Sequence, residues 1–356
     1  MGGGVKLLHV VGARPNFPKL APVWRAARSV GLDQVIVHTG QHYDDEMSAG
    51  FFRDLGVRAP DVNLDVGSGT HAAQTARVME RIEPIIVEHR PDWVVVYGDV
   101  NSTVAAALVA VKLGVRVAHV EAGVRSNDRS MPEEINRIVT DRLADLLLTP
   151  SRTADATLRS EGEPESEIAF VGNVMVDTLM FAVERARLTN FRGTIGANGH
   201  TVVVTLHRPS NVDDPVRLSA ITTALRDIAK ERSVVFPVHP RTRGRLESSR
   251  LDVGGVRLLP PLGYLEMLDV LDASSVVVTD SGGVQVESAA LGVPCLTVRR
   301  NTEWPETIDC GANRLVFDPA ELPSAVRSAH RFVQPTRPEG WDGMAAVRIV
   351  DCLRSA

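Results

Sequence analysis

The chain has 356 residues, of which 44% are hydrophobic, 23% charged and only 4% aromatic, the composition of an ordinary folded protein. This length exceeds what one hydrophobic core usually serves and predicts two domains. The net charge of -5 at pH 7 excludes a broad basic surface for nucleic acid, so any phosphate must be held by local groups.

The first half of the chain alternates short apolar runs with helical stretches. Near-continuous apolar strands of this kind, each followed by a helix, are typical of a parallel sheet that is covered on both faces. The predicted strands are residues 5–11, 34–40, 92–99, 115–123 and 145–151.

The same rhythm restarts after about residue 171, with strands predicted at residues 201–208, 233–240, 256–261, 275–283 and 293–300. We therefore predict an α/β protein of two Rossmann-like domains, residues 1–171 and 172–340. The amphipathic pattern of residues 341–353 predicts a last helix, through which residues 341–356 return to the first domain.

Polar and charged side chains follow the predicted strands, at the edge where open parallel sheets bind ligands. One such residue alone is often a helix cap, but a set drawn from both halves indicates a binding site. The set is Arg14, Lys19, Gln41, His42, Asp99, Glu121, Arg125, His207, Arg208, His239, Asp280 and Ser281.

The strongest local motif is TDSGGVQVE, residues 279–287. Ser281, Gly282 and Gly283 follow a strand and open a helix, where backbone N–H groups and the helix dipole favour a pyrophosphate. Glu287, one turn further along, is placed to accept both hydroxyls of a ribose. The alternative is a strand-to-helix turn that needs glycine only for its conformational freedom.

The run GARPNFPK, residues 12–19, follows the first predicted strand. Arg14 and Lys19 stand near the start of the next helix, in an arrangement that binds anions, although each alone is equally a surface charge. The run is not a Walker A loop, because Pro18 stands where that motif needs glycine, and no GxGxxG fingerprint occurs.

Carboxylates form the other part of the predicted site. Asp99 and Glu121 end successive predicted strands, and Glu133 and Glu134 open the next helix. Singly, Asp99 is explained as a helix cap and the glutamate pair as partners of the helix dipole. Together with His207, they supply the two positioned acid/base groups needed to remove a weakly acidic proton from a sugar ring and return one to the opposite face.

The sequence favours neither a metal site nor a disulfide framework. His38 and His42 are four residues apart but lie across a strand end rather than on a helix, and no HExxH motif occurs. The three cysteines are odd in number and widely spaced, as expected in a reducing cytoplasm. No signal peptide or membrane-spanning segment is predicted.

Eight motifs occur in a fixed order: GARPNFPK (12–19), TGQHYDDEM (39–47), GDVNST (98–103), HVEAGVRS (119–126), MPEEINR (131–137), TLHR (205–208), TDSGGVQVE (279–287) and TEWPET (302–307). In this order they resemble the UDP-N-acetylglucosamine 2-epimerase family, non-hydrolysing type, from the first strand to about Val316. The resemblance implies two Rossmann-like domains that face a central cleft (the GT-B type), with the second domain binding UDP, and a homodimer.

The resemblance also implies a mechanism. The proton on carbon 2 is removed, UDP leaves carbon 1 by anti elimination to give 2-acetamidoglucal, and UDP adds again with protonation on the other face. UDP-N-acetylglucosamine thereby becomes UDP-N-acetylmannosamine. No carbon is oxidised overall, so no NAD, metal or other cofactor is expected.

Matched position by position, the resemblance assigns acid/base and positioning roles to Asp99, Glu121, Glu133 and His207. It assigns contacts with UDP and its phosphates to Arg14, Lys19, His207, Ser281, Gly282 and Glu287. The predicted substrate-binding set also includes Arg125, His239 and Gly283. Which carboxylate serves which face of the sugar stays open.

Departures from the family pattern loosen the choice of substrate. Pro209 stands where bacterial enzymes carry an arginine of a second, regulatory UDP-sugar site, so activation by substrate is not expected. Trp304 replaces the arginine of the common T-E-R-P-E, and Met267 stands near where an aromatic residue often meets uracil. The spacing from Glu121 to Glu133 is shorter than in the enterobacterial type.

Three alternatives to the reversible epimerase remain. A hydrolysing 2-epimerase would release N-acetylmannosamine and UDP, but the intact HVEAGVR and TDSGGVQ motifs favour the non-hydrolysing reaction. A GT-B glycosyltransferase would need an acceptor site. A silent UDP-sugar sensor would have lost the carboxylates that this sequence retains.

Overall fold

The computed structural model describes residues 4–40, 53–330 and 337–356, and the chain divides into two compact units. Unit 1 comprises Met1–Thr178 and Glu339–Ala356, and unit 2 comprises Leu179–Pro338. The predicted boundary lies between residues 171 and 172, whereas the division by contacts falls inside helix α7 (Val174–Thr189).

Unit 1 contains a seven-stranded parallel sheet. Its strands lie in the order β3 (Val62–Asn63), β2 (Asp33–His38), β1 (Lys6–Val11), β4 (Trp93–Tyr97), β5 (Arg116–Val120), β6 (Leu146–Thr149) and β7 (Ile168–Phe170). The five strands predicted from the sequence are confirmed. The edge strands β3 and β7 were missed, because two or three residues are too few to show a pattern.

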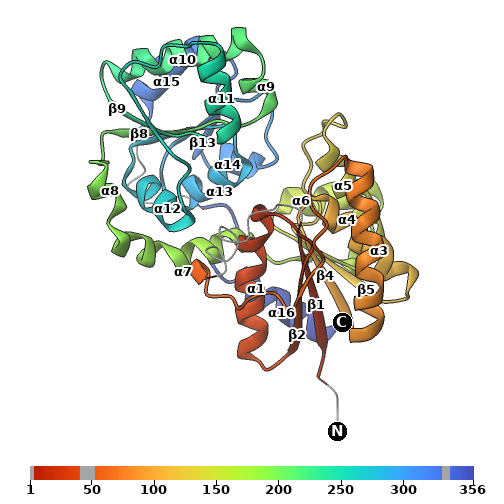
Figure 1. Cartoon of the computed structure of the whole chain (residues 1–356). Coiled ribbons are helices and arrows are strands. Elements are labelled where there is room, and N and C mark those ends of the chain that lie inside the picture. Colours follow the sequence, from red (N-terminus) through yellow and green to blue (C-terminus); the bar gives the residue numbers. More distant parts are fainter. Residues whose placement is uncertain (1–3, 41–52, 331–336) are drawn as a thin grey trace. The chain divides into compact units, whose positions relative to one another are not determined.

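Helices cover both faces of this sheet, which is why its inner strands are apolar on both sides. Helices α1 (Phe17–Ser29) and α16 (Ala345–Ser355) pack together on one face, while α3 (His71–His89), α4 (Asn101–Lys112) and α5 (Pro132–Leu143) follow one another along the other (Figure 1). Helix α6 (Arg152–Glu161) and the 3-10 turns Arg14–Asn16 and Glu165–Glu167 also belong to this unit.

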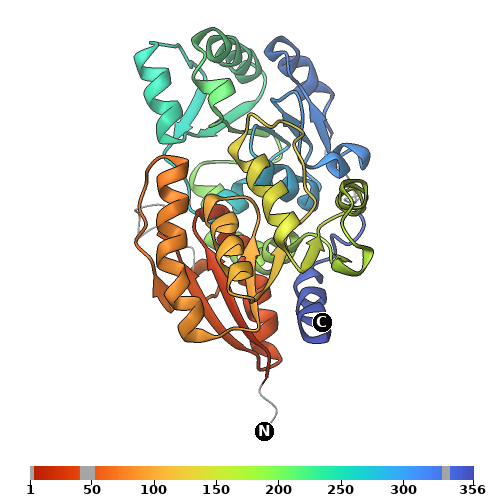
Figure 2. The ribbon, with the colours of Figure 1, turned by 90° about the vertical axis from the view of Figure 1, so that its right-hand side faces the viewer.

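The C-terminal helix belongs to unit 1, as predicted, and is drawn in blue beside the red strands in Figure 2. It begins at Ala345 rather than at Trp341, because the chain first makes a turn in which the Met344 N–H donates to Asp342. Trp341 is nevertheless buried, and its indole N–H donates to the carbonyl of Pro150 at 3.2 Å. The chain is therefore anchored to unit 1 before the helix starts.

Unit 2 contains a six-stranded parallel sheet in the order β10 (Val256–Leu259), β9 (Ser233–Pro237), β8 (Thr201–Thr205), β11 (Val276–Thr279), β12 (Cys295–Thr297) and β13 (Asn313–Leu315). The five predicted strands are again confirmed, and the short edge strand β13 was missed. Separate apolar clusters fill the two faces of this sheet, so each unit has its own core.

Helices also cover the second sheet. They are α8 (Phe191–Thr194), α9 (Pro209–Val212), α10 (Pro215–Ala229), α11 (Pro240–Ser248), α12 (Tyr264–Ala273), α13 (Gly282–Leu291), α14 (Pro305–Asp309) and α15 (Leu322–Ser328), with a 3-10 turn at Pro319–Glu321. The prediction of two Rossmann-like α/β domains is confirmed.

Candidate active site

The strand order reverses once in each sheet, between β1 and β4 in unit 1 and between β8 and β11 in unit 2. Open α/β sheets bind their ligands outside the carboxyl ends of the strands at such a reversal. Asp99 follows β4, while His207 and Ser281 follow β8 and β11. These predicted site residues therefore lie where the strand order of their own sheet reverses.

Asn16 joins the ends of β1 and β4. Its side-chain oxygen accepts hydrogen bonds from the N–H groups of Gly12 at 3.0 Å and Ala13 at 3.1 Å, and its amide donates to the carbonyl of Tyr97 at 2.8 Å. Position 12 requires glycine, because a Cβ there would lie 2.1 Å from the hydroxyl oxygen of Ser102. The motif GARPNFPK contains Asn16 but does not reveal its role, because its partner Tyr97 is distant in the sequence.

Some predicted residues fall outside this description. Gln41 and His42 lie in the segment 41–52, which the structure does not describe. Arg14 opens the 3-10 turn Arg14–Asn16, but its side chain is likewise outside the description.

A buried ion pair joins Lys19 on α1, the helix that follows β1, with Glu121 at the end of β5. The Lys19 Nζ lies 2.7 Å from Glu121 Oε1, and each side chain is only 7% exposed. Glu121 has a φ of +77°, a left-handed conformation that is unfavourable for a residue other than glycine. Its second oxygen, Oε2, is buried and receives no hydrogen bond from the residues that the structure describes. A strained, half-satisfied buried carboxylate of this kind suits an acid/base group.

Arg137 on α5 connects Asp99 with Glu134. Its guanidinium lies 2.5 Å from Asp99 Oδ2 and 2.6 Å from Glu134 Oε2. Arg137 is the last residue of the motif MPEEINR, but no role was predicted for it from the sequence. A helical arginine among carboxylates carries no local sign of which one it will pair with.

The two glutamates that open α5 differ in their surroundings. Glu134 is buried and accepts hydrogen bonds from the N–H groups of Ser126 and Asn127, each at 2.9 Å, so it fixes the loop before the helix. Glu133 is half-buried, and among the described residues no hydrogen bond or ion pair holds its carboxylate. Glu133 is thus the member of the pair with a carboxylate left for a ligand.

Arg125 lies in a buried network within unit 1. Its guanidinium lies 2.7 Å from both Asp141 Oδ2 and Glu161 Oε2. Burial opposes its charge, but these two carboxylates outweigh burial and raise the pKa of Arg125. Arg125, which was predicted to bind substrate, is therefore paired with two carboxylates of unit 1 itself.

His207 is oriented by Asp280 in unit 2. Asp280 is fully buried and accepts hydrogen bonds from the His207 N–H at 3.1 Å and the Asn211 amide at 3.0 Å. Burial would raise its pKa, but His207 and these hydrogen bonds lower it, so the carboxylate is ionised. The His207 Nδ1, 3.1 Å from Asp280 Oδ1, therefore donates, and the half-exposed ring is held with Nε2 directed away. The ring of His239 lies 6.1 Å from that of His207.

The start of α13 is arranged to receive an anion. Ser281 precedes the helix without capping it, and Gly282 and Gly283 form its half-buried first turn. A Cβ on Gly282 would lie 3.4 Å from the indole nitrogen of Trp304, which is itself buried. The tryptophan that departs from the family pattern therefore packs beside this turn.

Two glutamates near α13 have shifted pKa values in opposite directions. Burial raises the pKa of Glu287 to about 7, although a hydrogen bond with Tyr264 opposes the shift. Burial also acts on Glu303, but the two nitrogens of Arg299 at 2.6 and 2.9 Å, with Arg208 at 3.2 Å, lower its pKa to about 2. Glu303 is thus a fixed anion that holds Arg208, whereas Glu287 titrates near neutral pH.

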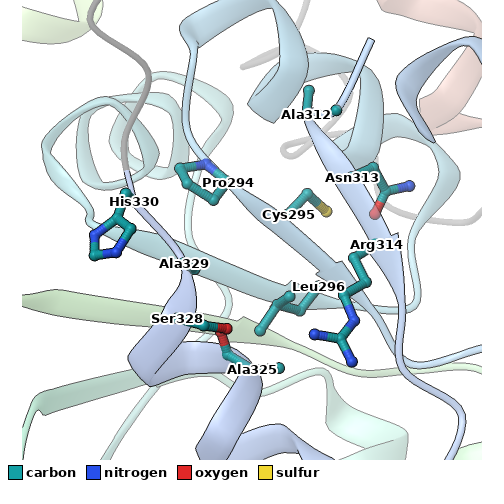
Figure 3. Close-up of a pocket in the computed structure, with 11 residues that line it drawn as sticks. Pro294, Cys295, Leu296, Ala312, Asn313, Arg314, Ala325, Ser328, Ala329 and His330 are labelled. Carbon is teal, nitrogen blue, oxygen red and sulfur yellow. The ribbon is translucent and has the colours of Figure 1, made fainter. Parts of the chain in front are cut away.

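A pocket of about 330 Å³ lies elsewhere in unit 2, at the amino ends of β12 and β13. Figure 3 shows Cys295, Asn313 and Arg314 around it, with His330 at its border. Amino and carboxyl ends are opposite edges of a parallel sheet, and none of the predicted site residues lines this pocket. It is therefore separate from the candidate site.

Within residues 4–40, 53–330 and 337–356 two features are absent. No group of three or more His, Cys, Asp or Glu side chains there could hold a metal ion. No helix in those ranges is long and apolar enough to cross a membrane.

Comparisons with known proteins agree with this geometry. The family model for UDP-N-acetylglucosamine 2-epimerase matches residues 25–354. The chain is 44% identical to the UDP-2,3-diacetamido-2,3-dideoxy-D-glucuronate 2-epimerase of Pseudomonas aeruginosa, covering 98% of this chain and 99% of that one. It is 42% identical to the UDP-N-acetylglucosamine 2-epimerase of Methanocaldococcus jannaschii, over 89% and 90%.

Solved structures give the same result. A crystal structure of the M. jannaschii enzyme in complex with UDP-GlcNAc and UDP matches with a TM-score of 0.90 and 39% identity, over 99% of this chain and 100% of that one. The enzyme of Neisseria meningitidis bound to UDP-GlcNAc matches with a TM-score of 0.89 and 26% identity, over 99% and 100%. The chain belongs to the UDP-N-acetylglucosamine 2-epimerase family.

Proposed function

We propose that the chain catalyses reversible epimerisation of UDP-N-acetylglucosamine at carbon 2, with UDP-N-acetylmannosamine as the product. The observation that carries this proposal is the pair of carboxylates at the ends of β4 and β5, Asp99 held by Arg137 and Glu121 held by Lys19, in a member of this family. Two acid/base groups are what proton removal and return on opposite faces require.

The proposed reaction balances without a cofactor. One group removes the proton from carbon 2 while the bond from carbon 1 to the UDP oxygen breaks, which leaves 2-acetamidoglucal and UDP. The UDP oxygen then adds to carbon 1 again, and a proton is delivered to the other face of carbon 2. No atom or electron is gained, so no oxidant is needed.

The roles divide between the units. We assign acid/base and positioning roles to Asp99, Glu121, Glu133 and His207. The N–H groups of Ser281, Gly282 and Gly283 bind the pyrophosphate, as the open first turn of α13 supports, and Glu287 binds the ribose. Arg14 and His239 contribute to binding of the UDP-sugar, whereas the internal ion pairs of Arg125 support a structural role for that residue.

The test is to incubate the purified protein with UDP-N-acetylglucosamine in heavy water, without added cofactor, and to follow the products by NMR. Deuterium at carbon 2 in a mixture of the two UDP-sugars supports the proposal. Free N-acetylmannosamine with UDP would instead show the hydrolysing reaction. Absence of both exchange and product would contradict activity on this substrate.

A second candidate substrate is UDP-2,3-diacetamido-2,3-dideoxy-D-glucuronate. It is favoured by the 44% identity, over almost the full length of both chains, to an enzyme named for it. The same assay with both substrates decides between them, because the physiological substrate has the higher kcat/KM. We further propose that the enzyme acts in the cytoplasm as a homodimer. Light scattering of the purified protein would test the dimer.

A further inference from the structure

One buried histidine touches all three elements that carry the proposed catalytic carboxylates of unit 1. His119 lies on β5, two residues before Glu121, and is fully buried. Its Nε2 lies 2.8 Å from the carbonyl oxygen of Gly98, the residue before Asp99. Its Nδ1 lies 2.6 Å from Asp141 Oδ1 on α5, the helix that Glu133 opens.

Both ring nitrogens of His119 are held by hydrogen bonds. The Gly98 carbonyl can only accept, so Nε2 carries a hydrogen. Asp141 also receives the Arg125 guanidinium at 2.7 Å and the Gly123 N–H at 3.1 Å. Burial would raise the pKa of Asp141, but His119 and Arg125 outweigh burial and lower it. The His119 ring is therefore held at both of its nitrogens.

The face of α5 explains why this link matters. Glu133, Arg137 and Asp141 are spaced four residues apart, so they lie along one face of the helix. Near the C-terminal end of α5, Asp141 is fixed to β5 through His119. In the middle of the helix, Arg137 is fixed to the end of β4 through its ion pair with Asp99. A shift of α5 along its axis would therefore break both links at once.

We propose that His119 is a positioning residue for the reaction, one that fixes Asp99, Glu121 and Glu133 relative to one another without touching the sugar. The inference rests on the proposed function and adds to it a residue that sets the catalytic geometry. Loss of His119 should misplace carboxylates on three different elements, and a displacement of about 1 Å at a reacting group costs roughly 10²-fold in rate.

His9 provides a matched control. It is also fully buried in the same sheet, on β1, but its ring nitrogens meet Tyr97 Oη at 2.8 Å and Gln34 Oε1 at 3.0 Å. Burial lowers its pKa to about 4, so this ring is neutral. Its two partners lie on β4 and β2, so His9 does not join β4, β5 and α5 as His119 does. Substitution of either histidine by glutamine removes one buried ring and its two hydrogen bonds.

In the kinetic test, His119→Gln should lower kcat by about 10²-fold while KM changes by less than about 3-fold. His9→Gln should keep kcat within about 3-fold of the wild type at a similar loss of melting temperature. The double variant His119→Gln/Asp141→Asn should be no slower than the slower single variant, because the two residues act as one unit. Equal losses of kcat in the two histidine variants would overturn the proposal.

A second measurement does not depend on activity. Hydrogen exchange should rise at residues 98–100 and 132–136 in His119→Gln and stay unchanged there in His9→Gln. If the wild type turns over neither UDP-sugar, the proposed function fails while these results still decide whether His119 holds the three elements. Unchanged exchange in His119→Gln would refute the positioning role.

Discussion

At the scale of single residues, two neighbouring glutamates show how environment separates structure from chemistry. Glu134 is buried and satisfied by the Ser126–Asn127 loop and by Arg137. Glu133, one position earlier, is half-buried, and none of the described residues pairs with its carboxylate. The same side chain is therefore a structural anchor at one position and a candidate acid/base group at the next.

We expect Glu133→Gln to lower kcat by about 10²-fold or more with little change in melting temperature, because it removes a proton-transfer group without breaking a contact. Glu134→Gln is the matched control. It should lower the free energy of unfolding by about 2 kcal/mol, since buried donors lose a charged acceptor. Steady-state kinetics and urea unfolding of both variants measure this. Equal kcat values in Glu133→Gln and the wild type would remove Glu133 from the catalytic set.

From the proposed role of Glu287 in binding the ribose, we expect its raised pKa to make UDP binding depend on pH. The carboxylate is ionised above pH 7 and protonated below it, and only the ionised form accepts both ribose hydroxyls. UDP affinity should therefore fall as the pH drops from 8 to 6, by about 10-fold from this group. Calorimetry at both pH values measures the change, and Glu287→Gln should have a shallower dependence. The titration of UDP itself is common to both proteins, so equal slopes would show that Glu287 does not bind the ribose in its ionised form.

At the scale of elements, α16 depends on a carboxylate supplied by α7. Asp177 accepts hydrogen bonds from the Ala345 N–H at 3.3 Å and the Ala346 N–H at 2.8 Å, which the helix itself cannot satisfy. The side chains that α16 then buries against unit 1 include Ile349, Val350 and Leu353. Asp177 of α7 therefore caps α16 and fixes the C-terminal helix to unit 1.

We expect Asp177→Ala to lower the free energy of unfolding by about 1–2 kcal/mol and to increase proteolysis within residues 345–356, because two buried N–H groups lose their acceptor. Asp351→Ala, at an exposed position of the same helix, should change neither. Urea unfolding and limited proteolysis test the pair. If both variants behave alike, the cap does not hold the helix.

At the scale of the whole molecule, the two units offer complementary groups: carboxylates in unit 1 and an open helix start beside Glu287 in unit 2. The proposed elimination and addition need no redox partner, and N–H groups at a helix start meet phosphate charge directly. We expect turnover to survive dialysis against EDTA with no nicotinamide present. Loss of activity that Mg²⁺ restores would contradict this and would require a metal in the mechanism.

Much of the fold could be predicted because its signals are local. The apolar runs of β1 and β4 are buried between helices, and each is long enough to show its pattern. The position of Ser281, Gly282 and Gly283 at a helix start could also be predicted, because a strand, a glycine-rich turn and a helix follow one another directly in the sequence. Edge strands such as β3, with two residues, show no pattern at all.

The sequence by itself determined the alternation of strands and helices, the order of the motifs and the positions of the candidate carboxylates, because each depends on a few neighbouring residues. Only the tertiary structure decided the partners. Lys19 and Glu121 are 102 residues apart, and they meet because β1 and β5 flank the same central strand, β4. Arg125 pairs with Asp141 and Glu161 for the same reason. Side-chain pairing depends on strand order and on which face of a helix a residue occupies, and no local sequence pattern contains this information.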